Sequence, residues 1–416
     1  MARMHLDRRP ILRGVLVAGL CALVAACDSD SGMDRAALEP MPQAAPTPQV
    51  ESKPLDAVVG QGTVKVALVL PQSASGNAGA AAQSMRNAAE LALAEFNTPD
   101  IQLVVKDDGG TAQGARAAAT AATDEGAKLV LGPLFAHSVA SAGQVAKQRN
   151  VPMLAFSTDQ NVATNGVFLL SFMPESDVDR IVSYAVSQGK RSFAALLPEN
   201  GYGSVVEAAF QTAVAKAGGR VVGLEHYSSD KAKMSEAIAR LASTLPQADA
   251  LLIPDSAADV QTVVGMLATN GVNLKRLQLL GTGLWDDPAI SRDESLSGAW
   301  YAAPDDRNYK GFVERYKAKY GSAPVRTASL AYDATALVAA LVKTQGPNAL
   351  TADTFASPTG FSGIDGAFRF KPDGGNERGL AVYKVQPGGA VMVSPAPTNF
   401  SGQTAQAAPS QDGRQN

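Results

Sequence analysis

Apolar runs and amphipathic segments alternate along most of this chain. The first run, residues 64–70, consists of Val, Ala and Leu with a single Lys. Such a run predicts a strand that is buried on both faces. Pro71 ends the run, and a small, polar loop follows it. Apolar residues then recur at helical spacing as far as Phe96, which predicts a helix that ends near Asn97. Strand, loop and helix in this order form the first half of a βαβ unit.

The same alternation continues over most of the remaining sequence. We expect further strands at residues 101–105, 129–131, 151–156, 193–197, 221–224, 250–253 and 277–280. We expect helices at residues 111–125, 138–149, 178–188, 205–217, 234–242, 257–269, 309–320 and 329–343. The last β-rich segments are expected at residues 367–370 and 380–385. Because strands and helices alternate and the pattern restarts near residue 178, we predict an α/β fold with two doubly wound parallel sheets.

The first residues have the pattern of a targeting signal. Basic residues precede an apolar stretch at residues 14–26, which is too short to span a bilayer as a helix. The stretch ends in Val-Ala-Ala followed by Cys27, and this resembles a bacterial lipobox. We therefore predict a signal peptide at residues 1–26 and a lipid on Cys27, with the protein facing the periplasm and held to a membrane only by that lipid. The alternative is an ordinary cleaved signal peptide beside an incidental cysteine.

Two segments lack any sustained periodicity. Residues 27–62 are rich in Pro and Ala, and we predict that they form a flexible tether after the lipidated cysteine. Residues 395–416 have a similar composition, and we predict a disordered tail there.

Composition restricts the function. The chain has 416 residues, enough for two domains, and a formal net charge of −3 without a basic cluster, so nucleic acid is not an expected partner. Only Cys21 and Cys27 are present, and removal of the first with acylation of the second leaves no disulfide. We find no H-E-x-x-H, C-x-x-C, G-x-S-x-G or Walker motif. We therefore predict no enzymatic activity, no cofactor and no metal site.

Short motifs recur in a recognisable order. They are Leu131-Gly132-Pro133, Gly201-Tyr202-Gly203, Gly281-Thr282-Gly283, Gly298-Ala299-Trp300-Tyr301 and Ala331-Tyr332-Asp333-Ala334. In this order they resemble the type I periplasmic solute-binding fold, in the branch of the Leu/Ile/Val-binding proteins, over residues 63–394. The resemblance implies two lobes joined by three crossings, with a small-molecule ligand between the lobes.

The resemblance also implies where the lobes divide. The crossings are expected near residues 168–175, 298–306 and 361–367. The first lobe would then contain residues 63–172 and 306–362, and the second lobe residues 173–305 and 363–394.

In amino-acid-binding members of this family, hydroxyl-bearing loops hold the carboxylate of the ligand. Here the serine expected after the Gly-Pro turn is replaced by Ala136, followed by His137 and Ser138. The loop after the fourth strand contains Ser157, Thr158 and Asp159. An aspartate beside a bound carboxylate would repel it or have to be protonated.

Other candidates complete the predicted ligand-binding set. Tyr202 lies in a Gly-rich loop that opens a helix, where an aromatic ring could cover the ligand, and Trp285 fits the same reasoning. Asp286 is a candidate replacement for the glutamate that meets the ligand ammonium in those relatives. Ser75 and Asp255 are the remaining members.

For several of these residues a structural role is an open alternative. Asp107 and Asp108 suit a turn better than a ligand site. Residues 157–159 could cap the next segment, and His137 could be an exposed residue at a helix start. Tyr332 and Asp333 fall in a helical pattern, where packing and capping are the simpler expectation.

A second resemblance competes with the first. Residues 154–159 and 166–174 are similar to the lipoproteins known as penicillin-binding-protein activators, which keep the solute-binding fold and stimulate a peptidoglycan synthase. On this basis the predicted function is activation of cell-wall synthesis, with a peptidoglycan synthase as partner. The alternative is the substrate-binding subunit of an ABC transporter for amino acids or another small solute, with an ABC permease as partner.

Overall fold

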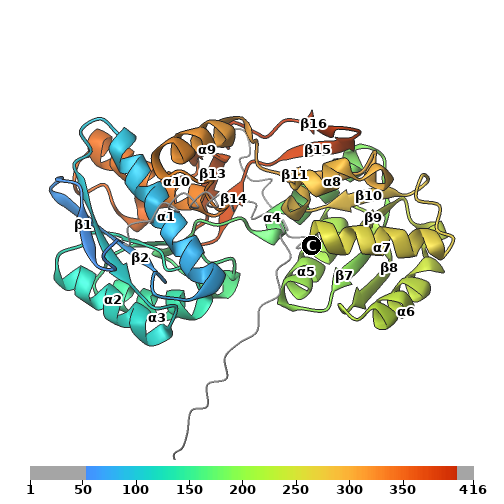
Figure 1. Ribbon diagram of the computed structural model, residues 1–416, viewed down its shortest axis with the longest axis horizontal. Helices are drawn as coiled ribbons and strands as arrows, with labels where there is room; N and C mark the ends of the chain where they lie inside the picture. Colours follow the sequence, from blue (N-terminus) through green and yellow to red (C-terminus); the bar gives the residue numbers. More distant parts are fainter. Residues whose placement is uncertain (1–52, 401–416) are drawn as a thin grey trace, which may run out of the picture. The chain divides into compact units, whose positions relative to one another are not determined.

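The computed structural model describes residues 53–400, and its first sheet is built around the strand predicted at residues 64–70 (Figure 1). β2 (Val64–Leu70) pairs in parallel with β3 (Ile101–Asp107) and with β4 (Val130–Leu131). β5 (Met153–Ala155) and β6 (Val167–Leu169) continue the sheet in parallel. Every residue of β2 except Lys65 is buried, which makes this strand the centre of the first core.

Helices cover both faces of the first sheet. α1 (Gly76–Glu95) and α10 (Ala328–Gln345) contribute to the core on one face. α2 (Ala112–Asp124) and α3 (Ala136–Gln148) form the core on the other face. The buried side of α2 consists of alanines, whose small side chains let the helix approach the sheet closely. The predicted doubly wound arrangement is confirmed for this sheet.

The edge of the first sheet differs from the prediction. Residues 57–59, which we placed in the tether, form β1 (Ala57–Val59), antiparallel to β3. Val58 is 58% exposed, so the strand has only a weak apolar signal. The predicted tether therefore extends too far along the chain. The predicted signal peptide, Cys27, residues 28–52 and residues 401–416 lie outside the described residues.

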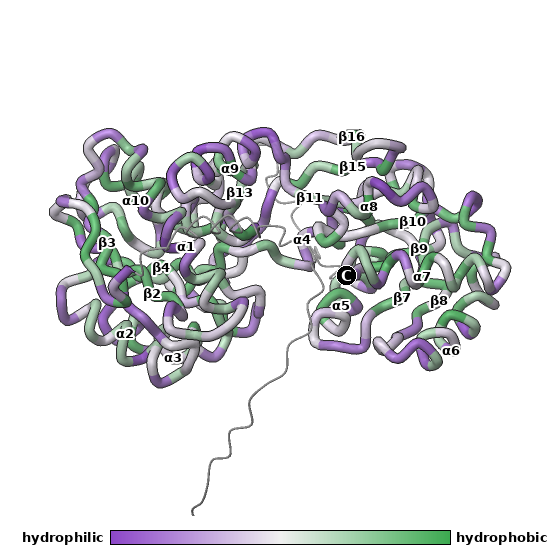
Figure 2. Tube along the Cα trace, in the orientation of Figure 1, coloured by the Kyte–Doolittle hydropathy of each residue, from purple (hydrophilic) through white to green (hydrophobic). Residues whose placement is uncertain are grey.

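The second sheet has a parallel centre and an antiparallel edge. Its strands are β7 (Ser192–Pro198), β8 (Arg220–Tyr227), β9 (Ala250–Leu252), β10 (Gln278–Gly281), β11 (Trp300–Ala303), β15 (Ala381–Gln386) and β16 (Gly389–Ser394). They lie in the order β16-β15-β11-β10-β9-β7-β8. All strands from β7 to β11 pair in parallel, whereas β15 and β16 pair antiparallel. Figure 2 shows the hydrophobic composition of central strands such as β7, whose residues are all buried.

Helices also enclose the second sheet from both sides. α4 (Pro174–Ser187) and α5 (Gly201–Lys216) share a core on one face. α6 (Lys231–Ala242), α7 (Ala257–Thr269) and α8 (Pro288–Arg292) form the core on the other. The remaining helices are α9 (Arg307–Tyr320), α11 (Ala352–Phe355) and the 3-10 turns η1 (Gln160–Val162), η2 (Leu245–Gln247), η3 (Gly283–Trp285) and η4 (Glu294–Leu296).

A small antiparallel sheet indicates where the third crossing between the lobes lies. It consists of β12 (Phe361–Gly363), β13 (Gly366–Phe370) and β14 (Asn376–Arg378). Phe368 and Phe370 pack into the first core, although the predicted boundaries assign them to the second lobe. Because β15 joins the second sheet, we propose that the third crossing lies just after Arg378 and not at residues 361–367. The other predicted lobe boundaries stay predictions.

The start of the predicted tail is also ordered. Phe400 is buried, and the guanidinium carbon of Arg369 lies 4.7 Å from the centre of its ring. Residues 395–400 therefore pack against the protein and do not belong to a disordered tail. Between residues 53 and 400, no helix has the length and apolar character that crossing a bilayer requires.

The central position of β2 gives a prediction about stability. Leu68→Ala should lower the free energy of unfolding by about 2–5 kcal/mol, because it removes buried methyl groups and leaves a cavity. Leu55→Ala is the matched control, since Leu55 is 46% exposed whereas Leu68 is fully buried. That control should change stability by less than about 0.5 kcal/mol. Urea denaturation followed by circular dichroism measures both, and equal effects would contradict a core centred on β2.

Candidate functional site

The predicted site residues follow parallel strands that end at one edge of each sheet. In the first sheet, the segments after β2, β4 and β5 hold Ser75, residues 136–138 at the start of α3, and residues 157–159. In the second sheet, the segments after β7, β9 and β10 hold Tyr202, Asp255 and residues 285–286. Open parallel sheets bind ligands at these edges. We call these two groups of loops the first edge and the second edge.

A buried carboxyl group lies at the first edge. Asp108 is 1% exposed, and its Oδ1 accepts a hydrogen bond of 2.8 Å from the backbone N–H of Gly110. Its Oδ2 is buried and has no hydrogen-bond partner. Burial raises the pKa of Asp108, and the bond from Gly110 opposes this. The carboxyl therefore has one oxygen held by the turn and one available to a donor.

Two predicted residues pack around the same turn. His137 Nε2 lies 2.9 Å from the carbonyl oxygen of Gly110, so this nitrogen donates to it. Ser138 is fully buried, and its Oγ donates to the carbonyl of Thr111 at 3.3 Å. The structure therefore brings His137 and Ser138 to the loop after β3, next to Asp108.

The loop after β5 is held by its own side chains. Ser157 is buried, and its Oγ accepts from the backbone N–H of Asp159 at 3.1 Å. Asp159 caps η1, because its Oδ1 accepts from the backbone N–H of Asn161 at 3.0 Å and from the amide of the same residue at 2.9 Å. The capping alternative for Asp159 is therefore present in the structure. It occupies one carboxylate oxygen of Asp159.

The remaining predictions at the first edge have fewer contacts. Ser75 precedes α1 as its N-cap residue, but its side chain makes no capping hydrogen bond and is exposed. Ala136 is the first residue of α3 and is partly buried. Thr158 is exposed.

At the second edge, hydrogen bonds join the starts of two helices to the loop after β10. The hydroxyl of Tyr202 and Oγ1 of Thr282 are 2.9 Å apart. Asp177, in the first turn of α4, accepts from the backbone N–H of Gly283 at 2.9 Å. Burial raises the pKa of Asp177 to about 7, while the Gly283 N–H and the charge of Arg378 oppose the change.

Asp255 belongs to the same edge. The hydroxyl of Tyr227, at the end of β8, donates to Asp255, which lies just beyond β9. The backbone N–H of Ser256 also donates to this carboxylate, at 2.7 Å. The structure therefore groups Asp255 with Tyr202 and Asp177 along the ends of neighbouring strands.

Trp285 and Asp286 do not share one environment. Trp285 is fully buried in the core of the second sheet, and its Nε1 donates to the carbonyl of Ile253 at 2.9 Å. An added Cβ at Gly281 would lie 2.1 Å from the indole, so a glycine is required for this packing. These contacts favour a structural role for Trp285 over the predicted cover for a ligand. Asp286 is exposed.

Several polar groups at the edges were not selected from the sequence. Asp177 and Glu175 lie in a helical start that gives no motif, and Thr282 was read only as part of a glycine-rich turn. Glu175 Oε2 is buried without a partner. Burial raises the pKa of Glu175, with Lys371 opposing and Asp159 adding to the rise. An unpaired buried oxygen has no signature in the sequence, because it depends on neighbours that are far away along the chain.

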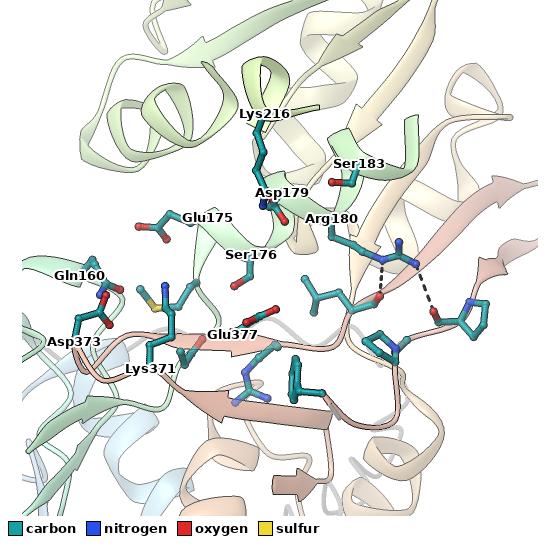
Figure 3. A pocket seen from close by; sticks show the side chains of 18 residues that line it. Gln160, Glu175, Ser176, Asp179, Arg180, Ser183, Lys216, Lys371, Asp373 and Glu377 are labelled. Atoms are coloured by element: carbon teal, nitrogen blue, oxygen red, sulfur yellow. Dashed lines mark hydrogen bonds and ion pairs between the residues drawn. The ribbon is translucent and has the colours of Figure 1, made fainter. Parts of the chain in front are cut away.

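A pocket lies beside these edges. It has a volume of about 850 Å³ and is lined by α4, the β13–β14 hairpin and residues 395–400 (Figure 3). None of the predicted site residues lines it, although Gln160 directly follows Asp159. We call it the crossing pocket, because it adjoins the segments that connect the two sheets. In residues 53–400, no cluster of three or more His, Cys, Asp or Glu side chains could hold a metal ion.

The raised pKa of Asp177 predicts a pH-dependent effect on stability. A carboxyl whose pKa rises from 3.8 to about 7 on folding stabilises the fold below pH 3.8 and loses this contribution as the pH rises to 7. Asp177→Asn removes the titration and keeps an oxygen for the Gly283 N–H. The stability of the variant relative to the unmodified protein should therefore increase between about pH 4 and pH 7. Urea midpoints across this range measure the difference, and a constant difference would contradict the assignment.

Solved structures with a similar fold place this arrangement among known proteins. A Rhodospirillum rubrum protein described as a branched-chain amino acid ABC transporter superposes with a TM-score of 0.70 at 21% identity, covering 79% of this chain and 99% of that one. A branched-chain amino acid transporter substrate-binding protein from Streptococcus pneumoniae, solved with isoleucine, superposes with a TM-score of 0.56 at 20% identity. That match covers 80% of this chain and 100% of the other. An ABC transporter solute-binding protein from R. palustris, solved with benzoate, superposes with a TM-score of 0.56 at 18% identity. That match covers 81% of this chain and 97% of the other. At these identities the likeness establishes the fold.

Sequence comparison gives the family. No curated protein sequence matches the chain. The profile of a family described as periplasmic binding protein matches residues 63–390, which is most of the chain and includes most strands of both sheets. The chain therefore belongs to the periplasmic binding protein family.

Proposed function

We propose that this protein captures a small solute in the periplasm and delivers it to an ABC-type transporter. Membership of the family supports the periplasmic location and the general role of solute binding. The similar structures include proteins of transporters for branched-chain amino acids and a protein solved with benzoate. Of the two functions that the sequence left open, these findings favour transport.

The observation that carries the proposal is the set of polar groups at the two edges. Asp108 offers an unpaired, buried carboxyl oxygen at the first edge. Tyr202, Asp177 and Asp255 offer a hydroxyl and two carboxylates at the second edge. A buried acceptor without a partner is costly, and a ligand that donates a hydrogen bond removes that cost. The solute should therefore carry N–H or O–H groups.

The first edge differs from a site built to hold a carboxylate. Ala136 offers no hydroxyl, Asp159 uses one carboxylate oxygen as a cap, and the Asp108 oxygen is an acceptor. These groups would repel a ligand carboxylate or leave it without donors. We infer that the solute does not present a carboxylate to the first edge.

The poor fit of the first edge to a ligand carboxylate also favours a second candidate function. If no solute binds at the edges, the fold would serve as an interaction module, as in the penicillin-binding-protein activators that residues 154–159 and 166–174 resemble. The partner would then be a peptidoglycan synthase. Neither candidate requires a catalytic group, and we propose no enzymatic activity.

We also propose that a lipid on Cys27 anchors the protein to a membrane. The lipobox-like sequence before Cys27 supports this proposal. The proline-rich residues that follow would act as the tether, which ends before β1 begins at Ala57.

A ligand screen tests the solute-binding proposal. Thermal unfolding of the purified protein is measured with amines, polyols, amino acids and peptidoglycan fragments. A ligand at about 100 times its Kd adds roughly 2.7 kcal/mol of stability. That increase should raise the midpoint of thermal unfolding by several degrees, at roughly 2–4 °C per kcal/mol. For any compound that shifts the midpoint, Tyr202→Phe should weaken binding about fivefold, because it removes a hydroxyl worth about 1 kcal/mol.

Tyr320→Phe is the matched control for that screen. Its hydroxyl also makes one hydrogen bond, to the carbonyl of Asn87, but in α9 and away from both edges. Equal losses in both variants would count against a site at the second edge. If no compound shifts the midpoint and the protein retains a peptidoglycan synthase in a pull-down, the activator function replaces transport.

The lipid anchor gives a separate prediction. Cys27→Ser should move the protein from the membrane pellet to the soluble fraction, because the serine hydroxyl does not replace the cysteine thiol that is acylated. Fractionation by ultracentrifugation and immunoblotting of the native host measures this. Cys21→Ser is the matched control, since it lies in the predicted signal peptide and should leave the distribution unchanged. Retention of Cys27→Ser in the pellet would exclude the proposed anchor.

A further inference from the structure

The second sheet ends in a strand that has a neighbour on one side only. β16 is the last strand in the order β16-β15-β11-β10-β9-β7-β8, and β15 is its partner. α8 packs on one face of β16, and Figure 1 shows this strand at the outer margin of the sheet. Within residues 53–400, no hydrogen bond from another element reaches its backbone. We call the side of β16 that faces away from β15 its free side.

The hydrogen bonds of β15 determine which backbone groups of β16 point to the free side. Both backbone groups of Val385 bond to the segment just before β11, at 2.9 Å each. The direction of these groups alternates along an antiparallel ladder, so Lys384 exchanges bonds with Val391, its partner in the register. Ala390 and Met392, on either side of Val391, therefore direct their backbone groups to the free side.

The sequence of β16 lacks the features that usually protect such a strand. It reads Gly389-Ala390-Val391-Met392-Val393-Ser394 and contains neither a charged residue nor a proline. Val391 is 49% exposed and Val393 is 38% exposed. Soluble proteins normally protect edge strands with charge, proline or a covering element, because open backbone groups pair readily with another strand. β16 therefore has the features of a strand that pairs with a further strand.

The other outer strands of the two large sheets differ from β16. β8 carries charged side chains, of which Glu225 pairs with Arg240 at 3.0 Å and His226 lies 3.0 Å from a glutamate of α5. At β6, the N–H of Leu169 donates to the carbonyl of Gly374 at 2.8 Å. β1 has only three residues. An open, uncharged strand of six residues is therefore a particular property of β16 among these four.

We propose that β16 is the contact surface for a second copy of this chain. The two β16 strands pair antiparallel about a twofold axis at Val391. Ala390 of each copy then lies opposite Met392 of the other, and their outward backbone groups exchange hydrogen bonds. A small side chain faces a large one, and valine faces valine on the axis, so the surface is complementary to itself. The proposal is independent of the proposed solute site, because β16 holds none of the predicted residues at the two edges.

The charges beside β16 permit two copies to approach each other. Lys384 of β15 lies opposite Val391 in the register. In the proposed pair, three strand spacings separate Lys384 of one copy from Lys384 of the other, which is about 14 Å. This exceeds the screening length of about 8 Å at physiological ionic strength. A strand from another protein would need an uncharged segment of its own, whereas a second copy brings one by symmetry.

Sedimentation velocity of the purified protein tests the proposal. Cys27→Ser is introduced so that a lipid does not contribute to association. We expect a monomer–dimer equilibrium with a Kd of about 1–100 µM, because a single pair of strands buries little surface. Ala390→Pro should weaken the dimer roughly tenfold or more, since each copy loses one outward N–H while the ladder with β15 stays intact.

Charged residues at position 391 give a stricter test. Val391→Lys and Val391→Glu should each be monomeric, because like charges would lie directly opposite each other. An equal mixture of the two variants should form dimers again, since opposite charges then meet on the axis. Val221→Lys is the matched control: Val221 is 38% exposed on β8, and its replacement should leave the dimer unchanged. Circular dichroism verifies that each variant folds.

Three outcomes would overturn the proposal. The first is a protein that stays monomeric up to about 100 µM, which would leave β16 for a strand of another protein. The second is a dimer that survives Ala390→Pro and both charged variants at position 391, because the contact would then use another surface. The third is a mixture of the two charged variants that stays monomeric, because two β16 strands would then not meet at Val391.

Discussion

Burial of parallel strands on both faces is the constraint on which the rest of this structure depends. β2 and β7 have almost no exposed residue, so each sheet needs helices on both sides, and every connection must return across the sheet. The polar residues that the layers exclude collect where the strands end. This is why Asp108, Asp159, Tyr202 and Asp255 gather at two edges although they are far apart in the sequence.

The energetics of polar burial differ between the two edges and the buried guanidinium of Arg378. At the edges, most polar groups already have protein partners, such as Tyr202 with Thr282 and Asp177 with Gly283. The guanidinium of Arg378 is instead fixed between two aromatic rings with its terminal nitrogens unpaired, and Asp365 and Asp333 supply opposite charge. The edge groups can therefore stand alone and still accept a solute, whereas the charge of Arg378 is opposed by charges within the protein.

Sequence reasoning succeeded where the signal is local. The helix at residues 257–269 and the strand at residues 64–70 were predicted with the bounds that the structure has, because unbroken periodicity and clear end signals define them. It failed at β1, whose short, exposed sequence resembles the tether, and at Phe400, whose burial depends on contacts with β13. It also failed at Trp285. An aromatic residue after a glycine turn can cover a ligand or pack into the core, and only its neighbours in the structure show which of the two it does.

By itself, the sequence determined the α/β class, the two doubly wound sheets, the order of the main strands and helices, and the segments in which polar residues collect. These follow from apolar periodicity and from glycine and proline signals, which act over a few residues. Only the tertiary structure decided which groups are paired. Asp159 proved to cap η1, while Asp108, Glu175 and Arg378 retain unpaired buried atoms. Pairing depends on atoms brought together from distant parts of the chain, and no local pattern encodes their distances.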